Sequence, residues 1–336
     1  MKLSIFKYMF KIPDLRKRIV FTLLMFGVYR LGAAVPVPGV DLDAVQRLTE
    51  SGTQAGIYGL LNLFSGGALE TFSVFALGIM PYITASIILQ LLTVVIPRLQ
   101  KLQEEGESGR KIITQWTRYV TVVLALLQST GLTYIFSRGS LTGGISLIPN
   151  YTPSRVGLIV LTMTAGTAFI MWLGELISQR GIGNGMSLII FASIISQLPA
   201  SFGGAYQVTA GQGRIGQFSV LVLMFFLMIV GIIYVEQGQR RIPIQFAKRV
   251  RGRKVMGGQS TYIPLKVNSA GVIPVIFATS VLFFPALIAT SLPQDNRVTA
   301  GIRNWIDVNL ANSQGTSWFY IFFLGMLIIF FTYFYT

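Results

Sequence analysis

Residues 71–97 contain no charged side chain, and this uncharged stretch constrains the fold more than any other feature of the chain. An α-helix rises about 1.5 Å per residue, so about 20 residues cross a hydrocarbon core of about 30 Å, and the stretch is long enough to do so. Residues 57–64 form a shorter apolar segment that ends at Ser65-Gly66-Gly67. A short apolar segment beside a full span predicts a half-helix that enters a membrane protein and returns. The alternative is a hydrophobic loop on the outer side of the membrane.

The composition is that of a membrane protein, with 12% charged and 52% hydrophobic residues and a mean hydropathy of +0.64. Soluble domains carry about twice this share of charge. Apolar runs long enough to span a bilayer occur at residues 19–35, 75–96, 113–136, 156–177, 186–198, 217–235, 270–292 and 318–336. We therefore predict an all-α polytopic membrane protein with eight spans, the first of them an uncleaved anchor.

The positive charges indicate the orientation. Most of the 27 Lys and Arg residues fall on one side of the membrane if the N-terminus is cytoplasmic, in residues 1–18, 98–118 and 240–266 and at Arg180. The positive-inside rule then predicts a cytoplasmic N-terminus, and eight spans return the other end to the same side. The net charge of +15 is thereby concentrated on one face.

The chain has no Cys and no His, which excludes thiol chemistry, disulfides, imidazole bases and the usual transition-metal ligands. Every Asp lies outside the predicted spans, which excludes a paired-aspartate intramembrane protease. We expect no enzyme, no metal and no cofactor. Glu175, near the cytoplasmic end of the fourth span, is the candidate for a proton relay, but a single carboxylate near an interface is expected to be solvated or paired instead.

Residues 236–266 form the longest predicted cytoplasmic loop, and it is strongly basic. Its cluster without any acidic residue consists of Arg240, Arg241, Lys248, Arg249, Arg251, Arg253 and Lys254. Such a cluster retains the loop on the cytoplasmic side and attracts anionic lipid. The other interpretation is a docking surface for RNA phosphates or an acidic partner. Charge alone favours neither.

The glycine-rich segment GIGNG (181–185) superficially resembles a phosphate-binding loop, but no strand precedes it and no Lys-Ser/Thr follows. We predict instead a tight turn between two spans, in which Asn184 caps the fifth.

Six segments, in this order and spacing, together resemble the SecY family, the central pore-forming subunits of the Sec protein-conducting channel, or translocon. They are NLFSGG (62–67), FALGIMPYI (75–83), EGESGR (105–110), GIGNG (181–185), GQRRI (238–242) and AGVIP (270–274). The resemblance covers essentially the whole chain and implies a helical bundle with a re-entrant plug half-helix. Family members have two halves of five spans. We therefore expect eight of ten transmembrane helices here and a chain truncated after the eighth span.

The resemblance implies an N-terminal half in residues 1–198, with five spans and a plug at about 57–70, and a partial C-terminal half in residues 199–336, with three spans and the basic loop. It also assigns three sets of site residues. The apolar pore constriction would consist of Ile79, Ile83, Met186, Ile190 and Ile276. The plug would include Leu60, Leu61, Asn62, Leu63, Phe64, Ser65, Gly66 and Gly67. The lateral gate would include Thr84, Gln90, Asn268 and Phe284.

Local patterns agree with these assignments. Ile79 and Ile83, like Met186 and Ile190, are four positions apart, so each pair projects from one face of a helix. A ring of apolar side chains excludes water and ions by dewetting. The two glycines at the end of the plug predict a hinge with little steric restriction. The alternatives are ordinary lipid and core contacts for the apolar pairs, and simple helix packing for the polar gate residues.

By this resemblance, the chain would translocate unfolded secretory polypeptides and release apolar segments laterally into lipid. The implied partners are the small membrane subunits SecE and SecG, the SecA motor ATPase, the ribosome with its RNA and proteins at the basic loop, the nascent polypeptide or its signal sequence, and membrane lipids. The implied location is the plasma (inner) membrane or the thylakoid membrane. A small-solute secondary transporter is the alternative, but it would place ionisable side chains in mid-membrane, where this chain has apolar pairs. A non-conducting assembly scaffold is a third possibility.

Overall fold

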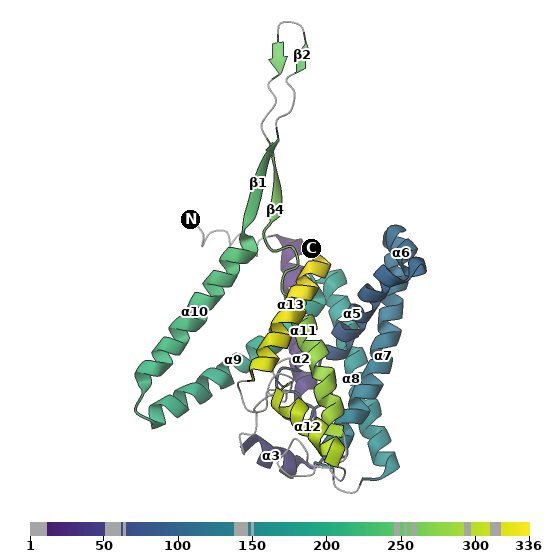
Figure 1. Ribbon diagram of the computed structural model, residues 1–336, viewed down its shortest axis with the longest axis vertical. Coiled ribbons are helices and arrows are strands. Elements are labelled where there is room, and N and C mark those ends of the chain that lie inside the picture. Colours follow the sequence, from purple (N-terminus) through teal and green to yellow (C-terminus); the bar gives the residue numbers. More distant parts are fainter. Residues whose placement is uncertain are drawn as a thin grey trace. The chain divides into compact units, whose positions relative to one another are not determined.

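The computed structural model describes residues 12–50, 62, 65–137, 147–148, 151–244, 249–251, 254–256, 261–291, 297–309 and 317–336 (Figure 1). The helices are α2 (Pro13–Ala34), α3 (Leu42–Glu50), α5 (Met80–Val95), α6 (Pro97–Glu104), α7 (Glu107–Ser137), α8 (Pro153–Arg180), α9 (Gly185–Gly211), α10 (Ile215–Gln237), α11 (Ile273–Ser291), α12 (Arg297–Asn309) and α13 (Trp318–Tyr335). The strands are β1 (Gln239–Ile244), β2 (Arg249–Arg251), β3 (Lys254–Met256) and β4 (Thr261–Lys266). The predicted helical fold class is confirmed.

The chain divides into two compact units. The first contains Met1–Ala200 and Thr279–Gly325, and the second contains Ser201–Ala278 and Met326–Thr336. All three boundaries between them interrupt helices, namely α9, α11 and α13. Each unit is therefore described by itself below.

The uncharged stretch at 71–97 is not one continuous helix, contrary to the sequence-based prediction. Residues 66–79 form successive turns, and α5 begins only at Met80. Gly78 has a φ of 57°, in the left-handed region that interrupts a helix, and Pro81 lies in the first turn of α5, where its missing N–H costs no hydrogen bond. Apolar composition alone therefore overstated the length of this helix.

The same stretch ends in a sharp bend. Ile96 is extended, with φ −101° and ψ 111°, and α5 and α6 meet there at an angle of 100°. The cause is Pro97, because its ring disfavours the helical region for the residue before it. The bend directs α6 away from the axis of α5.

The turns at 66–79 lie at the centre of the first unit. Leu69 and Phe72 are almost completely buried and belong to an apolar cluster that also contains Phe136 of α7 and Ile159 of α8. The rings of Phe72 and Phe136 meet edge to face with centroids 4.9 Å apart. This burial explains how an irregular segment is retained at membrane depth, since protein rather than lipid surrounds it.

The chain is a multi-pass membrane protein. Four described helices, α8, α9, α10 and α13, are long and apolar enough to cross a membrane, and the bent pair of α5 and α6 adds a fifth candidate. Each of the eight predicted spans overlaps a helix, although α9 continues to Gly211, well beyond the predicted end at residue 198. The number eight stays a prediction.

The basic loop forms a β-hairpin structure in the second unit, which the sequence analysis did not predict. Strand β1 pairs antiparallel with β4, and β2 pairs with β3. Figure 1 shows β1 continuing directly from the end of α10. The paired strands hold the basic segment as an extended projection.

The GIGNG segment is a tight turn between α8 and α9, as predicted. Gly183 has a φ of 66°, and the Asn184 side-chain oxygen accepts a hydrogen bond of 3.0 Å from the backbone N–H of Met186, so Asn184 caps α9. A Cβ atom on Gly185 would overlap the backbone carbonyl oxygen of Gly174 in α8. The absence of a side chain at Gly185 therefore sets the close approach of these two helices.

We expect Gly185→Ala to destabilise the folded protein by about 1–3 kcal/mol, because the added methyl group must push α8 and α9 apart. The measurement is the thermal unfolding midpoint in detergent. Gly203→Ala in the same helix is the matched control, since a Cβ atom there would meet no heavy atom within 4 Å. Equal midpoints for the two variants would contradict the close packing at Gly185.

Candidate functional site

The predicted constriction residues of the first unit lie at the beginnings of two helices. Ile79 is the N-cap of α5, and its carbonyl oxygen accepts a hydrogen bond from the Ile83 N–H at 3.2 Å. Both side chains are buried. Met186 and Ile190 are half-buried in the first turns of α9. Ile276, half-buried in α11, belongs to the second unit, so the ring of five stays a prediction.

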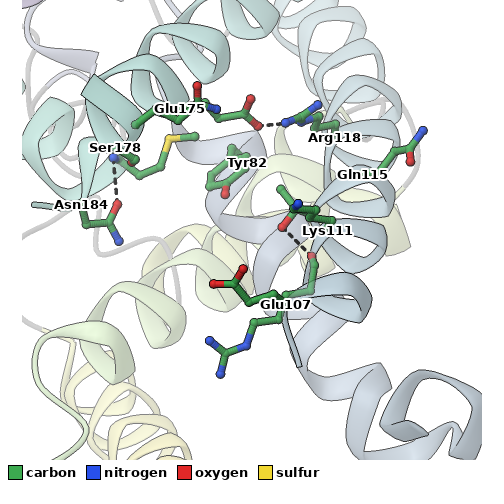
Figure 2. A pocket seen from close by; sticks show the side chains of 12 residues that line it. Tyr82, Glu107, Lys111, Gln115, Arg118, Glu175, Ser178 and Asn184 are labelled. Carbon is green, nitrogen blue, oxygen red and sulfur yellow. Dashed lines mark hydrogen bonds and ion pairs between the residues drawn. The ribbon is translucent and has the colours of Figure 1, made fainter. Parts of the chain in front are cut away.

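A pocket of about 670 Å³ lies beside this region, and the sequence analysis missed it. Its walls come from the first turn of α5, the N-terminal part of α7, the C-terminal end of α8 and the start of α9 (Figure 2). We predict that the ends of α7, α8 and α9 that line it are cytoplasmic. It is lined by Tyr82, Glu107, Arg110, Lys111, Thr114, Gln115, Arg118, Glu175, Ser178, Gln179, Asn184 and Met186. The pocket therefore combines a mostly polar wall with Met186 of the predicted constriction.

An ion pair bridges two walls of the pocket. The guanidinium Nε of Arg118 in α7 donates to a carboxylate oxygen of Glu175 in α8 at 2.6 Å. Figure 2 shows the ring of Tyr82 close to this pair. The Arg118 side chain is 45% exposed, so the net contribution to stability is about 0–1 kcal/mol. Of the two expectations for Glu175, solvated or paired, the structure shows the paired one. Opposite charges at the ends of adjacent predicted spans were the signal that could have identified Arg118 as the partner.

The plug residues Leu60, Leu61, Leu63 and Phe64 lie outside the described part of the chain. Asn62 and the following Ser65-Gly66-Gly67 are described. Gly66 and Gly67 have φ values of 69° and 86°, which favour glycine. A Cβ atom on Gly66 would lie 3.0 Å from the Ser193 Cα of α9, so the glycine also permits close packing here. The role of the two glycines as a hinge stays a prediction.

The predicted gate residues lie in different settings. Thr84 is buried in α5 and donates to the Met80 carbonyl oxygen at 3.0 Å, and Gln90 is exposed on the same helix. Asn268 lies in the turn after β4, where its amide nitrogen donates to Glu236 at 3.2 Å and its amide oxygen accepts from the Gly271 N–H at 3.1 Å. Of Phe284 the structure describes only the backbone, within α11. Their common role as a gate stays a prediction.

The predicted docking residues follow the hairpin. Arg240 and Arg241 are exposed on β1, and the Arg241 guanidinium carbon lies 4.8 Å from the centre of the Tyr262 ring on β4. The backbones of Arg249, Arg251 and Lys254 belong to the short strands β2 and β3. Lys248 and Arg253 lie outside the described residues. The cation–π contact orients Arg241 before any partner binds.

The chain is similar to known proteins over almost its whole length. The family model for SecY matches residues 73–336. A protein translocase subunit SecY from Streptomyces coelicolor is 51% identical over 343 aligned residues, which cover 99% of this chain and 76% of the relative. This level of identity indicates that the chain functions as a protein translocase subunit. A small-solute secondary transporter finds no support.

Two solved channels show the same fold. A SecY channel studied for the plug domain that stabilises its closed state has a TM-score of 0.55 and 18% identity, and the match covers 82% of this chain and 58% of that one. The yeast Ssh1 complex bound to the 80S ribosome has a TM-score of 0.58 and 19% identity, covering 83% and 60%. The chain thus spans less than two thirds of these two channel chains. The family-model match and the identity to a curated subunit lead to one conclusion: the chain belongs to the SecY family.

Proposed function

We propose that the chain forms the pore of a channel that carries unfolded polypeptides across the membrane and releases apolar segments sideways into lipid. The observation that carries this proposal is the 51% identity to a protein translocase subunit over 99% of the chain. An unfolded polar chain needs such a path, because each unpaired peptide group costs several kcal/mol in hydrocarbon. The halves at residues 1–198 and 199–336 would flank this path.

Three parts of the proposed channel would control passage: a constriction, a plug and a lateral gate. Ile79, Ile83, Met186, Ile190 and Ile276 would form the apolar constriction, and residues 60–67 would close it from outside. Thr84, Gln90, Asn268 and Phe284 would line the lateral gate. An apolar segment gains about 0.3–0.6 kcal/mol per Leu, Ile, Phe or Val at the bilayer centre, so ten such residues supply about 3–6 kcal/mol for lateral release.

The driving force would come from a partner docked on the hairpin, since we assign no catalytic role and no cofactor to the chain. An elongating ribosome or the SecA motor would bind the basic residues from Arg240 to Lys254, and SecE and SecG would pack in the membrane. Support comes from the ribosome-bound yeast Ssh1 complex, which has the same fold. The N-terminus would be cytoplasmic and the membrane the plasma or thylakoid membrane.

The docking proposal is tested by replacing Arg251, Arg253 and Lys254 with Ala in the full-length channel. We expect ribosome binding to weaken about tenfold or more and its dependence on salt to flatten, because fewer ion pairs form with RNA phosphates. Binding is measured by cosedimentation across a salt series, and polypeptide transport by protection of a secretory reporter in vesicles.

The matched control replaces Arg214, Arg297 and Arg303 with Ala, which removes the same charge from the face predicted to be exterior. This control should bind like the parent. An unchanged affinity and salt slope in the hairpin variant would assign its charges to membrane orientation alone. A parent channel that protects no reporter would refute the proposed function itself.

A further inference from the structure

The segment that ends the proposed plug is tied to two helices by side chains that the family assignment does not explain. From α2, the Tyr29 hydroxyl donates to the Ser65 carbonyl oxygen at 3.0 Å. The adjacent Arg30 guanidinium donates to the Gly66 carbonyl oxygen at 2.7 Å. Two consecutive carbonyl groups of a turn are therefore held by two consecutive residues of one helix.

Helix α9 contacts the same point. The Ser193 hydroxyl lies 2.7 Å from the Tyr29 hydroxyl, and the Ser196 hydroxyl donates to the Gly66 carbonyl oxygen at 3.4 Å. The Arg30 guanidinium also reaches the Ser196 hydroxyl at 3.4 Å. We call the group of Tyr29, Arg30, Ser65, Gly66, Ser193 and Ser196 the latch. It joins α2, α9 and the end of the plug.

The Tyr29 side of the latch is buried within the first unit, whereas Arg30 is exposed and Ser196 is half-buried. Tyr29, Ser65 and Ser193 are each no more than 2% exposed. Hydrogen bonds in such a setting are stronger than in water, and a buried donor or acceptor that loses its partner is costly. Gly66 allows the approach, because its φ of 69° and its missing side chain place its carbonyl group against α9.

The turn that carries the latch is itself closed. The Asn62 amide nitrogen donates to a Glu70 carboxylate oxygen at 2.9 Å, and the Asn62 amide oxygen accepts from the Glu70 N–H at 3.2 Å. The Gly67 N–H donates to the Asn62 carbonyl oxygen at 3.0 Å. Holding Ser65 and Gly66 therefore also holds Asn62 and Glu70, which are joined to them by these hydrogen bonds.

We propose that Tyr29 and Arg30 are positioning residues of the channel, which keep the plug closed by fastening its end to α2 and α9 together. Because the same hydrogen bonds join all three parts, separation of α2 from α9 and release of the plug are one coupled step. This inference rests on the proposed function, since that proposal assigns the plug its role.

The test uses two substitutions that remove hydrogen bonds with little change in shape. Tyr29→Phe keeps the ring that stacks on Phe75 at 5.8 Å and loses only the hydroxyl. Arg30→Met keeps an unbranched side chain and loses the guanidinium. Each lost hydrogen bond should raise the ratio of open to closed channels about threefold to tenfold. The measurement is the open probability of resting single channels of the full-length complex in planar bilayers.

Three further variants separate positioning from general stability. Tyr206→Phe removes an exposed hydroxyl from the same helix, α9, and should behave like the parent. Arg30→Lys retains a charged donor and should stay closer to the parent than Arg30→Met does. Adding Ser193→Ala to Tyr29→Phe should raise the open probability less than the two single effects combined, because both act on one hydrogen bond.

The outcomes distinguish this inference from the proposed function. Open probabilities equal to the parent in both Tyr29→Phe and Arg30→Met would overturn the latch, even if deletion of residues 60–67 produces a leak. A parent channel that carries no secretory reporter would instead overturn the proposed function. Higher open probability in both variants, together with better export of a reporter with a weakened signal and an unchanged thermal midpoint, is the result that we expect.

Discussion

Channels that lack residues 60–67 should stay folded and inserted while their resting ion conductance rises by about tenfold or more. The deletion removes the proposed plug together with the latch carbonyl groups of Ser65 and Gly66, so several hydrogen bonds of about 1 kcal/mol each are lost from the closed state. It stops before Leu69 and Phe72, which anchor the apolar core of the first unit. The measurement combines expression level with conductance in planar bilayers.

Gly66→Ala is the companion variant for this deletion, because it leaves the plug present but strains its end. The added methyl group would meet the Ser193 Cα at 3.0 Å and would require a left-handed backbone at an alanine. We expect an intermediate leak. If the deletion abolishes assembly and the remaining folded protein shows no leak, residues 60–67 are a structural element and the plug assignment is wrong.

Sequence reasoning succeeded where one local rule determines the structure. The cap at Asn184 follows from the preference of helix N-termini for a side-chain acceptor, and the expectation that Glu175 is solvated or paired follows from the cost of an isolated carboxylate near hydrocarbon. The helical class follows from apolar runs of sufficient length. Each of these inferences needed only neighbouring residues or the bilayer thickness.

The errors arose where tertiary packing overrides local pattern. Residues 71–79 carry no charge and read as part of a span, but Gly78 and Pro81 delay the helix, and burial around Phe72 makes the resulting turns acceptable in the membrane. The latch could not be predicted from the sequence for a related reason. Tyr29 and Ser193 are far apart in the sequence, and neither belongs to a motif, so only the fold brings their hydroxyl groups within 2.7 Å.

The hairpin was missed because residues 236–266 were interpreted from their charge alone, and each of the two long strands contains a proline. Pro243 in β1 and Pro264 in β4 weaken any strand signal in residues 236–266, since proline removes a hydrogen-bond donor from a sheet. A two-stranded ladder has only edge strands, where an N–H group that faces outward is not needed. The composition rule is therefore valid for central strands and fails for an isolated hairpin.

The second large effect is expected at Ile276, where Ile276→Asn should raise the resting conductance about tenfold or more. Asparagine offers hydrogen bonds to water at the proposed constriction, so the dewetted barrier falls, and about 1 kcal/mol of apolar burial is lost from the closed state because Ile276 is half-buried. The fold should tolerate the change. The neighbouring Phe277 carries the packing against α13, with its ring 5.6 Å from that of Phe331, and adjacent helical positions point about 100° apart.

Ile276→Leu is the matched control, because it keeps both volume and apolarity and should remain as tight as the parent. The polar variant should also export a reporter whose signal has a shortened apolar core, since a hydrated constriction needs less help from the signal to open. Single-channel conductance of the Asn, Leu and parent channels is measured beside this export. Equal resting conductance in all three would show that Ile276 does not line the constriction. The seal would then depend on Ile79, Ile83, Met186 and Ile190, the residues of the first unit, and the pore would have to be reassigned around them.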